Sequence, residues 1–163
     1  MGGRNRQSGV AAVEFAIVLV FVLLPILFGV IDFGRLMYEY NTIAKAARDA
    51  ARLMSTQAPS DPDYPTLVAS ATCLAVHGNQ SCTGAPLLPG LTTAMVSLCD
   101  PASCPSTHAN VATGTGVINL VTVTIGGPNT PYAFSLLTPL APLVFGGPFL
   151  NFGAISVTMH QVV

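Results

Sequence analysis

The carboxylate of Glu14 lies inside an otherwise apolar segment of the chain. The residues from Phe15 to Ile31 carry no charge, and Val10 to Val13 extend the apolar stretch to 22 residues that Glu14 alone interrupts. A carboxylate in hydrocarbon costs on the order of a few kcal/mol unless it has a partner. We therefore expect Glu14 either to pair with a positive group or to lie solvated in the headgroup region.

Four cysteines form the second set of residues that could do chemistry. They are Cys73, Cys82, Cys99 and Cys104, and all of them follow the apolar segment. An even number of cysteines predicts disulfides where this part of the chain lies outside the cytoplasm. Of the three possible pairings we favour Cys73–Cys82 with Cys99–Cys104, because each pair brackets a turn rich in glycine, proline or serine.

Metal and catalytic chemistry lack a recognisable pattern of residues. A zinc site is the alternative use of the cysteines, but there is no C-x2-C pair and the histidines are not at paired ligand spacing. These histidines are His77, His108 and His160. The pair Asp61 and Asp63 could contact calcium, although in a proline-rich stretch it is more typical of a turn. Motifs of hydrolases, metalloproteases and phosphate-binding loops are absent. We therefore expect no enzyme, no catalytic residue, no metal and no cofactor.

A single long helix would have to position Glu14. Twenty-two residues span about 33 Å at ~1.5 Å per residue, which is enough for a hydrocarbon core of ~30 Å. Arg4 and Arg6 precede this segment, so the positive-inside rule predicts a cytoplasmic N-terminus and an outer C-terminal domain. Pro25 should kink the helix or loosen its hydrogen bonding. A removed signal peptide is the alternative, but its apolar region would be shorter, at ~7–15 residues.

The helix is predicted to continue to about Ser55 as an amphipathic stalk. Apolar residues recur there at spacings of three and four, which places them on one stripe of an α-helix. The stripe consists of Leu36, Tyr40, Ile43, Ala47, Ala51 and Met54, and the opposite side carries Lys45, Arg48, Asp49 and Arg52. The stripe predicts packing on the chain's own globular domain, on neighbouring subunits, or on both.

The remainder of the chain predicts a small α+β domain. Residues 65–76 favour a short helix, and alternating apolar residues at 94–98, 121–125 and 155–160 favour strands. The predicted fold is a long N-terminal helix, half transmembrane and half stalk, packed on a small antiparallel sheet. Residues 132–152 carry no charge but include three prolines, which argue against a second spanning helix. They predict either a loop that contacts a partner or the membrane, or a buried connection.

The order of the N-terminal features resembles the signal of type IV prepilins and pseudopilins: a basic leader, a glycine, four residues, a glutamate, and a long apolar helix. Residues 9–52 resemble the TadE family, the pseudopilin-like proteins of tight-adherence (Flp-type) pilus systems. The matching pieces are GVAAVEFAIV at 9–18, Pro25, Asp32-Phe33-Gly34-Arg35 and IAKAARDAAR at 43–52.

The resemblance implies that a prepilin peptidase cuts between Gly9 and Val10. It also implies that Glu14 is an assembly residue, which pairs with the new amine of Val10 in a neighbouring subunit or in its own. The implied organisation is a leader at 1–9, a transmembrane helix at 10–31, a stalk at 32–55 and an extracytoplasmic domain at 56–163.

The implied function is that of a minor pseudopilin-like component of a tight-adherence pilus or a related secretion apparatus, because the main fibre subunits of such systems are much shorter. Its implied partners are the lipid bilayer of the bacterial inner membrane, the prepilin peptidase, and other pilus subunits or assembly proteins. The alternative is a membrane-anchored binding module that uses the helix only as an anchor. The net charge of −1 implies no attraction to nucleic acid.

Overall fold

The computed structural model describes residues 7–137 and 146–161 of the chain, with the backbone alone for Gln7 and Ser8. The chain divides into two compact units. The first contains Met1–Met37 and Ser135–Leu150, and the second contains Tyr38–Phe134 and Asn151–Val163. The middle of the proline-rich segment predicted at 132–152 lies outside the described residues, as does most of the predicted leader.

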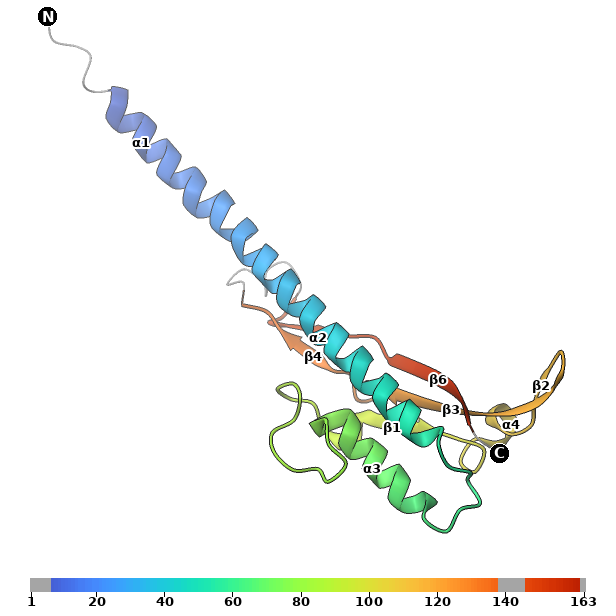
Figure 1. Ribbon diagram of the computed structural model, residues 1–163. Coiled ribbons are helices and arrows are strands. Elements are labelled where there is room, and N and C mark those ends of the chain that lie inside the picture. The colour runs from blue at the N-terminus through green and yellow to red at the C-terminus, as the bar shows by residue number, and fades with distance from the viewer. Residues whose placement is uncertain (1–6, 138–145, 162–163) are drawn as a thin grey trace, which may run out of the picture. The chain divides into compact units, whose positions relative to one another are not determined.

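One helix runs without interruption from the start of the apolar segment to the end of the stalk, as the sequence predicted (Figure 1). It consists of α1 (Gln7–Val18), the π-helical segment η1 (Leu19–Leu23) and α2 (Leu24–Met54). Pro25 lacks an amide hydrogen and its ring clashes with the carbonyl four residues earlier. The amide of Leu24 bonds to the carbonyl of Leu19, five residues back. The predicted loosening at Pro25 therefore takes the form of a wider π turn.

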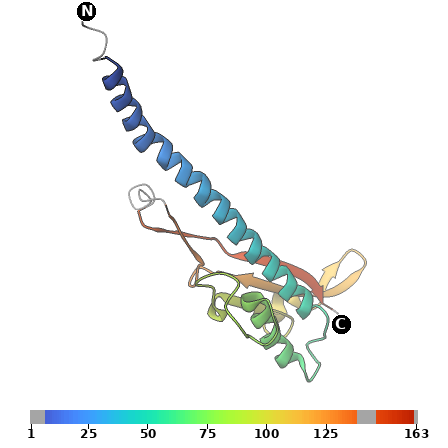
Figure 2. The same cartoon turned by 60° about the vertical axis from the view of Figure 1, so that its left-hand side comes forward.

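The second unit contains an antiparallel sheet centred on one long strand (Figure 2). Its strands are β1 (Val96–Cys99), β2 (Val111–Thr113), β3 (Gly116–Ile125) and β6 (Ile155–Gln161). β1 pairs with the C-terminal half of β3 and β2 with its N-terminal end, whereas β6 pairs with β3 along residues 119–125. The three predicted strands are confirmed, although the first begins as a short 3-10 turn, η2 (Thr93–Met95). The short hairpin strand β2 was not predicted.

The helix predicted at 65–76 is α3 (Tyr64–His77), and it ends at Gly78 in the left-handed conformation, with φ of 71°. Such a residue is the common stop of a helix, because glycine reaches this region without a Cβ penalty. The remaining elements are a four-residue helical turn α4 (Pro105–His108) and the paired short strands β4 (Ala133–Ser135) and β5 (Phe149–Asn151).

The core of the second unit forms where the stalk part of α2 packs with α3 and the central sheet strands. The buried stalk residues are Ile43, Ala44, Ala46, Ala47, Ala50, Ala51 and Met54, and their partners in the core include Ala71, Ala75, Val121, Val123 and Ile125. The predicted stripe is thus confirmed from Ile43 onward, whereas Tyr40 is 44% exposed. The four charged residues on its opposite side are exposed, so the stalk packs on the chain's own domain.

Candidate membrane anchor and assembly site

The membrane-length part of the helix exposes its apolar side chains along its whole length. No residue of its most apolar 18-residue window is buried, and Phe15 and Phe21 are 68% and 74% exposed. Within residues 7–137 and 146–161 this is the one helix that is long and apolar enough to cross a membrane. Apolar surface of this extent marks an interaction site in a soluble protein and is satisfied by lipid in a membrane anchor.

Glu14 is exposed on this helix, and its carboxylate makes no hydrogen bond or ion pair with another described residue. It lies four residues after Val10, so the two side chains share one face of the helix. Gly9 is also helical and exposed, and no heavy atom lies within 4 Å of the position that a Cβ would occupy there. Gly9, Val10 and Glu14 therefore lie on one accessible stretch, whereas the four predicted cysteines all lie in the second unit.

A shallow apolar groove runs along the helix beside Glu14, from Ala12 to Phe21. It is lined by Ala12, Val13, Ala16, Ile17, Val20 and Phe21. Small residues one turn apart let the backbone of a second helix approach closely, which is how helices associate in lipid, where there is no hydrophobic force between them. The surface can therefore serve as a packing face for another helix, beside a carboxylate that has no partner among the described residues.

A second carboxylate, Asp32, marks the other end of the charge-free stretch. Unlike Glu14 it is buried, with 4% of its surface exposed. Its two oxygens accept the amide hydrogen of Leu137 at 3.0 and 3.1 Å, and Oδ1 lies 3.4 Å from Nη1 of Arg35. The guanidinium of Arg35 also donates to the carbonyl of Ser135 at 3.3 Å. The pair therefore ties residues 135 and 137, some 100 positions later, to this turn of the helix.

Asp32 and Arg35 are part of the motif that resembles the TadE family, but the sequence predicted no contact for either of them. The sequence signal was present, because Asp32 is the first charge after 17 uncharged residues and Arg35 follows at the i,i+3 spacing of a helical ion pair. What was missing is the bonding partner, since nothing in the sequence connects an acid at 32 with a backbone amide at 137.

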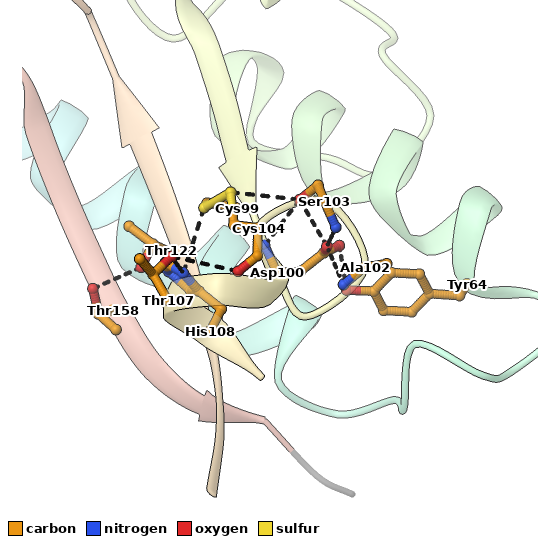
Figure 3. The surroundings of a disulfide bond; sticks show 10 residues. All are labelled: Tyr64, Cys99, Asp100, Ala102, Ser103, Cys104, Thr107, His108, Thr122 and Thr158. Carbon is orange, nitrogen blue, oxygen red and sulfur yellow. Dashed lines mark hydrogen bonds between the residues drawn. A yellow bond between two sulfur atoms is a disulfide. The ribbon is translucent and has the colours of Figure 1, made fainter. Parts of the chain in front are cut away.

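The second unit contains a buried polar cluster at the end of β1 (Figure 3). One oxygen of Asp100 accepts the amides of Ala102 and Ser103 and the hydroxyl of Ser103, at 3.0, 2.7 and 2.7 Å. Its other oxygen accepts the hydroxyl of Tyr64 at 2.7 Å. Burial alone would raise the pKa of Asp100, but the hydrogen bonds from Ser103, Tyr64 and Ala102 outweigh it and hold that pKa below its usual value.

The two disulfides of the structure are Cys73–Cys82 and Cys99–Cys104, the pairing that the sequence favoured. Cys99 Sγ lies 3.5 Å from Nδ1 of His108, and Nε2 of the same ring lies 2.8 Å from Thr122 Oγ1 (Figure 3). The ligand-type atoms of Cys99, Cys104 and His108 lie within 4.8 Å of one another. A metal binds thiolates, however, and both sulfurs are used in the disulfide. The cluster is therefore a disulfide beside an imidazole.

The remaining candidate residues lie in a turn, for Asp61 and Asp63, and on a strand, for His160. Asp61 Oδ1 accepts the amide of Asp63 at 2.9 Å, which is the bond of a turn. His160 is exposed on β6.

The one match among the comparisons with known proteins covers the part of the chain that contains Glu14 and Asp32. The model of the family described as TadE-like protein matches residues 9–52, which is about a quarter of the chain. This is the family that the N-terminal motif resembles. No curated protein and no solved structure matches the chain.

Proposed function

We propose that this protein is a membrane-anchored, minor pseudopilin-like component of a tight-adherence (Flp-type) pilus or a related secretion apparatus. It would lie in the inner membrane of a bacterium, with its N-terminus in the cytoplasm and its second unit outside. It would act by assembly with other subunits through its N-terminal helix, without catalysis or a cofactor.

One observation carries the proposal: Glu14 is exposed, without a partner among the described residues, on a helix of membrane length that matches the TadE-like family. The two disulfides support an oxidising compartment for the second unit. Arg4 and Arg6 before the apolar segment support a cytoplasmic N-terminus, which places the second unit outside.

Glu14 would act through the amine that cleavage after Gly9 creates on Val10. An α-amine has a pKa near ~8 and is mostly protonated at neutral pH. In hydrocarbon, pairing a carboxylate with an ammonium group offsets the free-energy cost of burying both charges. A subunit in the wrong register would leave both charges unpaired, and that register is therefore disfavoured. The pair would therefore select the register in which one subunit joins the next.

Replacement of Glu14 tests this proposal. We expect Glu14→Leu and Glu14→Gln chains to insert into the membrane as before but to lose co-purification with other pilus subunits and pilus-dependent adherence. Asp49→Asn is the matched control, because Asp49 is an exposed acid on the stalk and its replacement should change neither readout. If Glu14→Leu chains stay membrane-bound, still co-purify with other pilus subunits and still support adherence, the pairing role of Glu14 is wrong.

A membrane-anchored binding module is the second candidate. The observation in its favour is that the family match ends at residue 52, before the whole sheet of the second unit. Adjacent genes distinguish the two candidates: a prepilin peptidase, a secretion ATPase and a short pilin favour the first, whereas an isolated gene favours the second.

A further inference from the structure

We propose that the ribbon formed by β4 and β5 rests on the membrane, with Leu137 and Phe149 in contact with lipid at the boundary between headgroups and acyl chains. This inference rests on the membrane anchoring in the proposed function, and it adds a second contact between the chain and the bilayer. All residues that carry it belong to the first compact unit.

The position of Leu137 relative to the spanning segment carries the argument. Asp32 is the first residue after the charge-free stretch that ends at Ile31. From Val10 to Ile31 the helix covers about 33 Å, so Ile31 reaches the edge of a hydrocarbon core of ~30 Å. The hydrogen bonds from the amide of Leu137 to both oxygens of Asp32, at 3.0 and 3.1 Å, hold residue 137 at this same level.

The ribbon carries apolar side chains that nothing in the described chain covers. Leu137 is 54% exposed and Phe149 is 59% exposed. The amide of Leu136 bonds to the carbonyl of Pro148 at 2.9 Å, which keeps the two sides of the ribbon together beside these residues. Outside the long helix only two other large apolar side chains, those of Leu87 and Val117, are exposed among the described residues. No charged residue occurs between Ser135 and Leu150.

Lipid is the occupant that fits this surface, because the surface continues that of the span. On the helix beside Asp32, Val30 and Phe33 are 66% and 63% exposed, so the apolar face of the anchor extends to the level of the ribbon. The polar groups at this level are already bonded: Asp32 to Arg35 and Leu137, and Arg35 to Ser135. An apolar surface with satisfied polar groups matches the interfacial zone, in which amphipathic helices bury their apolar faces by about 5–10 Å.

The absence of tryptophan from the sequence allows a direct test. Single-tryptophan chains Leu137→Trp and Phe149→Trp are reconstituted in full length into phosphatidylcholine vesicles. In separate samples, part of the lipid is brominated either near the headgroup or near the chain end. We expect blue-shifted emission and stronger quenching by the shallow bromine than by the deep one. Val117→Trp provides the emission of an exposed apolar position that the proposal does not assign to lipid.

A fourth chain separates this inference from the proposed function. Phe21→Trp lies in the middle of the span and should be quenched most by the deep bromine. If Phe21→Trp is not quenched, the membrane anchoring itself is wrong. If it is quenched while Leu137→Trp and Phe149→Trp match Val117→Trp, the anchor stands and the present inference is overturned. Blue-shifted emission at 137 and 149 without quenching by either lipid also overturns it, because protein would then cover the ribbon.

The bonds to Asp32 provide a second, independent readout. In a Leu137→Trp chain, the further change Asp32→Ala removes the acceptor of the residue 137 amide, and we expect the quenching by shallow bromine to fall. Asp32→Asn retains one acceptor oxygen and should fall less. Circular dichroism and alkylation of thiols confirm that both chains keep their helix and disulfides. Unchanged quenching in a folded Asp32→Ala chain would show that these bonds do not hold the ribbon at the membrane.

Discussion

The hydroxyl of Tyr64 donates a 2.7 Å hydrogen bond to the carboxylate of Asp100, 36 residues further along the chain. Tyr64 begins α3 and Asp100 directly follows β1, so this bond joins the helix to the sheet inside the second unit. Tyr64 also accepts a hydrogen bond from Nε2 of Gln161, on the last strand, at 3.0 Å. Three segments that are remote in sequence thus meet at one buried hydroxyl.

The first prediction concerns the acid stability of the second unit. In the folded chain, hydrogen bonds hold the pKa of Asp100 below its usual value, whereas an unfolded carboxyl titrates near ~3.9. Asp100 therefore stabilises the fold fully above that pH, and this contribution is lost as the pH falls through the folded pKa. We expect Asp100→Asn to cost about 1–3 kcal/mol at neutral pH and to reduce the pH dependence of stability below ~4. Urea unfolding of the detergent-solubilised chain, followed by circular dichroism, measures both effects.

The same bond has an alkaline counterpart. Burial and the bond to Asp100 raise the pKa of Tyr64 well above its usual value of 10.0. Its contribution to stability is therefore present below ~10 and declines as the pH rises toward the folded pKa. Tyr64→Phe should remove this alkaline decline. A Tyr64→Phe chain with the same alkaline unfolding profile as the wild type would contradict the assignment.

The second prediction concerns the two disulfides. They close loops with sequence separations of 9 and 5 residues, for which loop-closure entropy gives about 2–3 and about 2 kcal/mol. The turn from Cys99 to Cys104 is also held by the bonds of Asp100 to Ser103 and Ala102. We therefore expect paired alanine replacements at Cys99 and Cys104 to cost less than those at Cys73 and Cys82. Chemical unfolding measures the difference, and alkylation of four free thiols in native, unreduced protein would contradict both pairs.

The third prediction concerns the packing of the stalk. Ala47 is fully buried, with 0% of its surface exposed, whereas its neighbour Arg48 is exposed. Ala47→Leu adds volume to a filled core and should cost about 1–3 kcal/mol. Arg48→Leu introduces the same side chain on the solvent face and should change the free energy of unfolding by less than about 0.5 kcal/mol. Equal effects of the two replacements in urea unfolding would argue against the packing of the stalk on its own domain.

The fourth prediction concerns processing at the N-terminus. We expect a cut between Gly9 and Val10, because the basic leader, the glycine and the apolar segment are in register with the family motif, and the peptidase needs a small residue where it approaches the backbone. Mass spectrometry of the N-terminal peptide from membranes with and without the peptidase tests this. A chain that still begins at Met1 or Gly2 in the peptidase-positive strain would refute it.

Local pattern was sufficient for the long helix, α3 and three of the strands, but not for the short elements β2, α4, β4 and β5. The run from Phe15 to Ile31 predicted a spanning helix because hydropathy and length are properties of a contiguous segment. The spacing from Ile43 to Met54 predicted the buried face of the stalk because helical period is local. The alternation at 121–125 and 155–160 likewise predicted β3 and β6. The favoured cysteine pairs are close in sequence, so their turns were visible without the fold.

The tertiary structure alone decided which distant residues meet. The bond of Asp32 to the amide of Leu137 joins residues 105 positions apart, and the contact of Gln161 with Tyr64 joins residues 97 positions apart. Sequence periodicity does not predict such pairs, because every residue except proline has a backbone amide hydrogen. The sequence also does not distinguish an acid that is buried from one that is exposed. Glu14 and Asp32 flank the same charge-free run of one helix, Phe15 to Ile31. Only the folding of residues 135–137 onto α2 makes Asp32 buried and bonded and leaves Glu14 exposed.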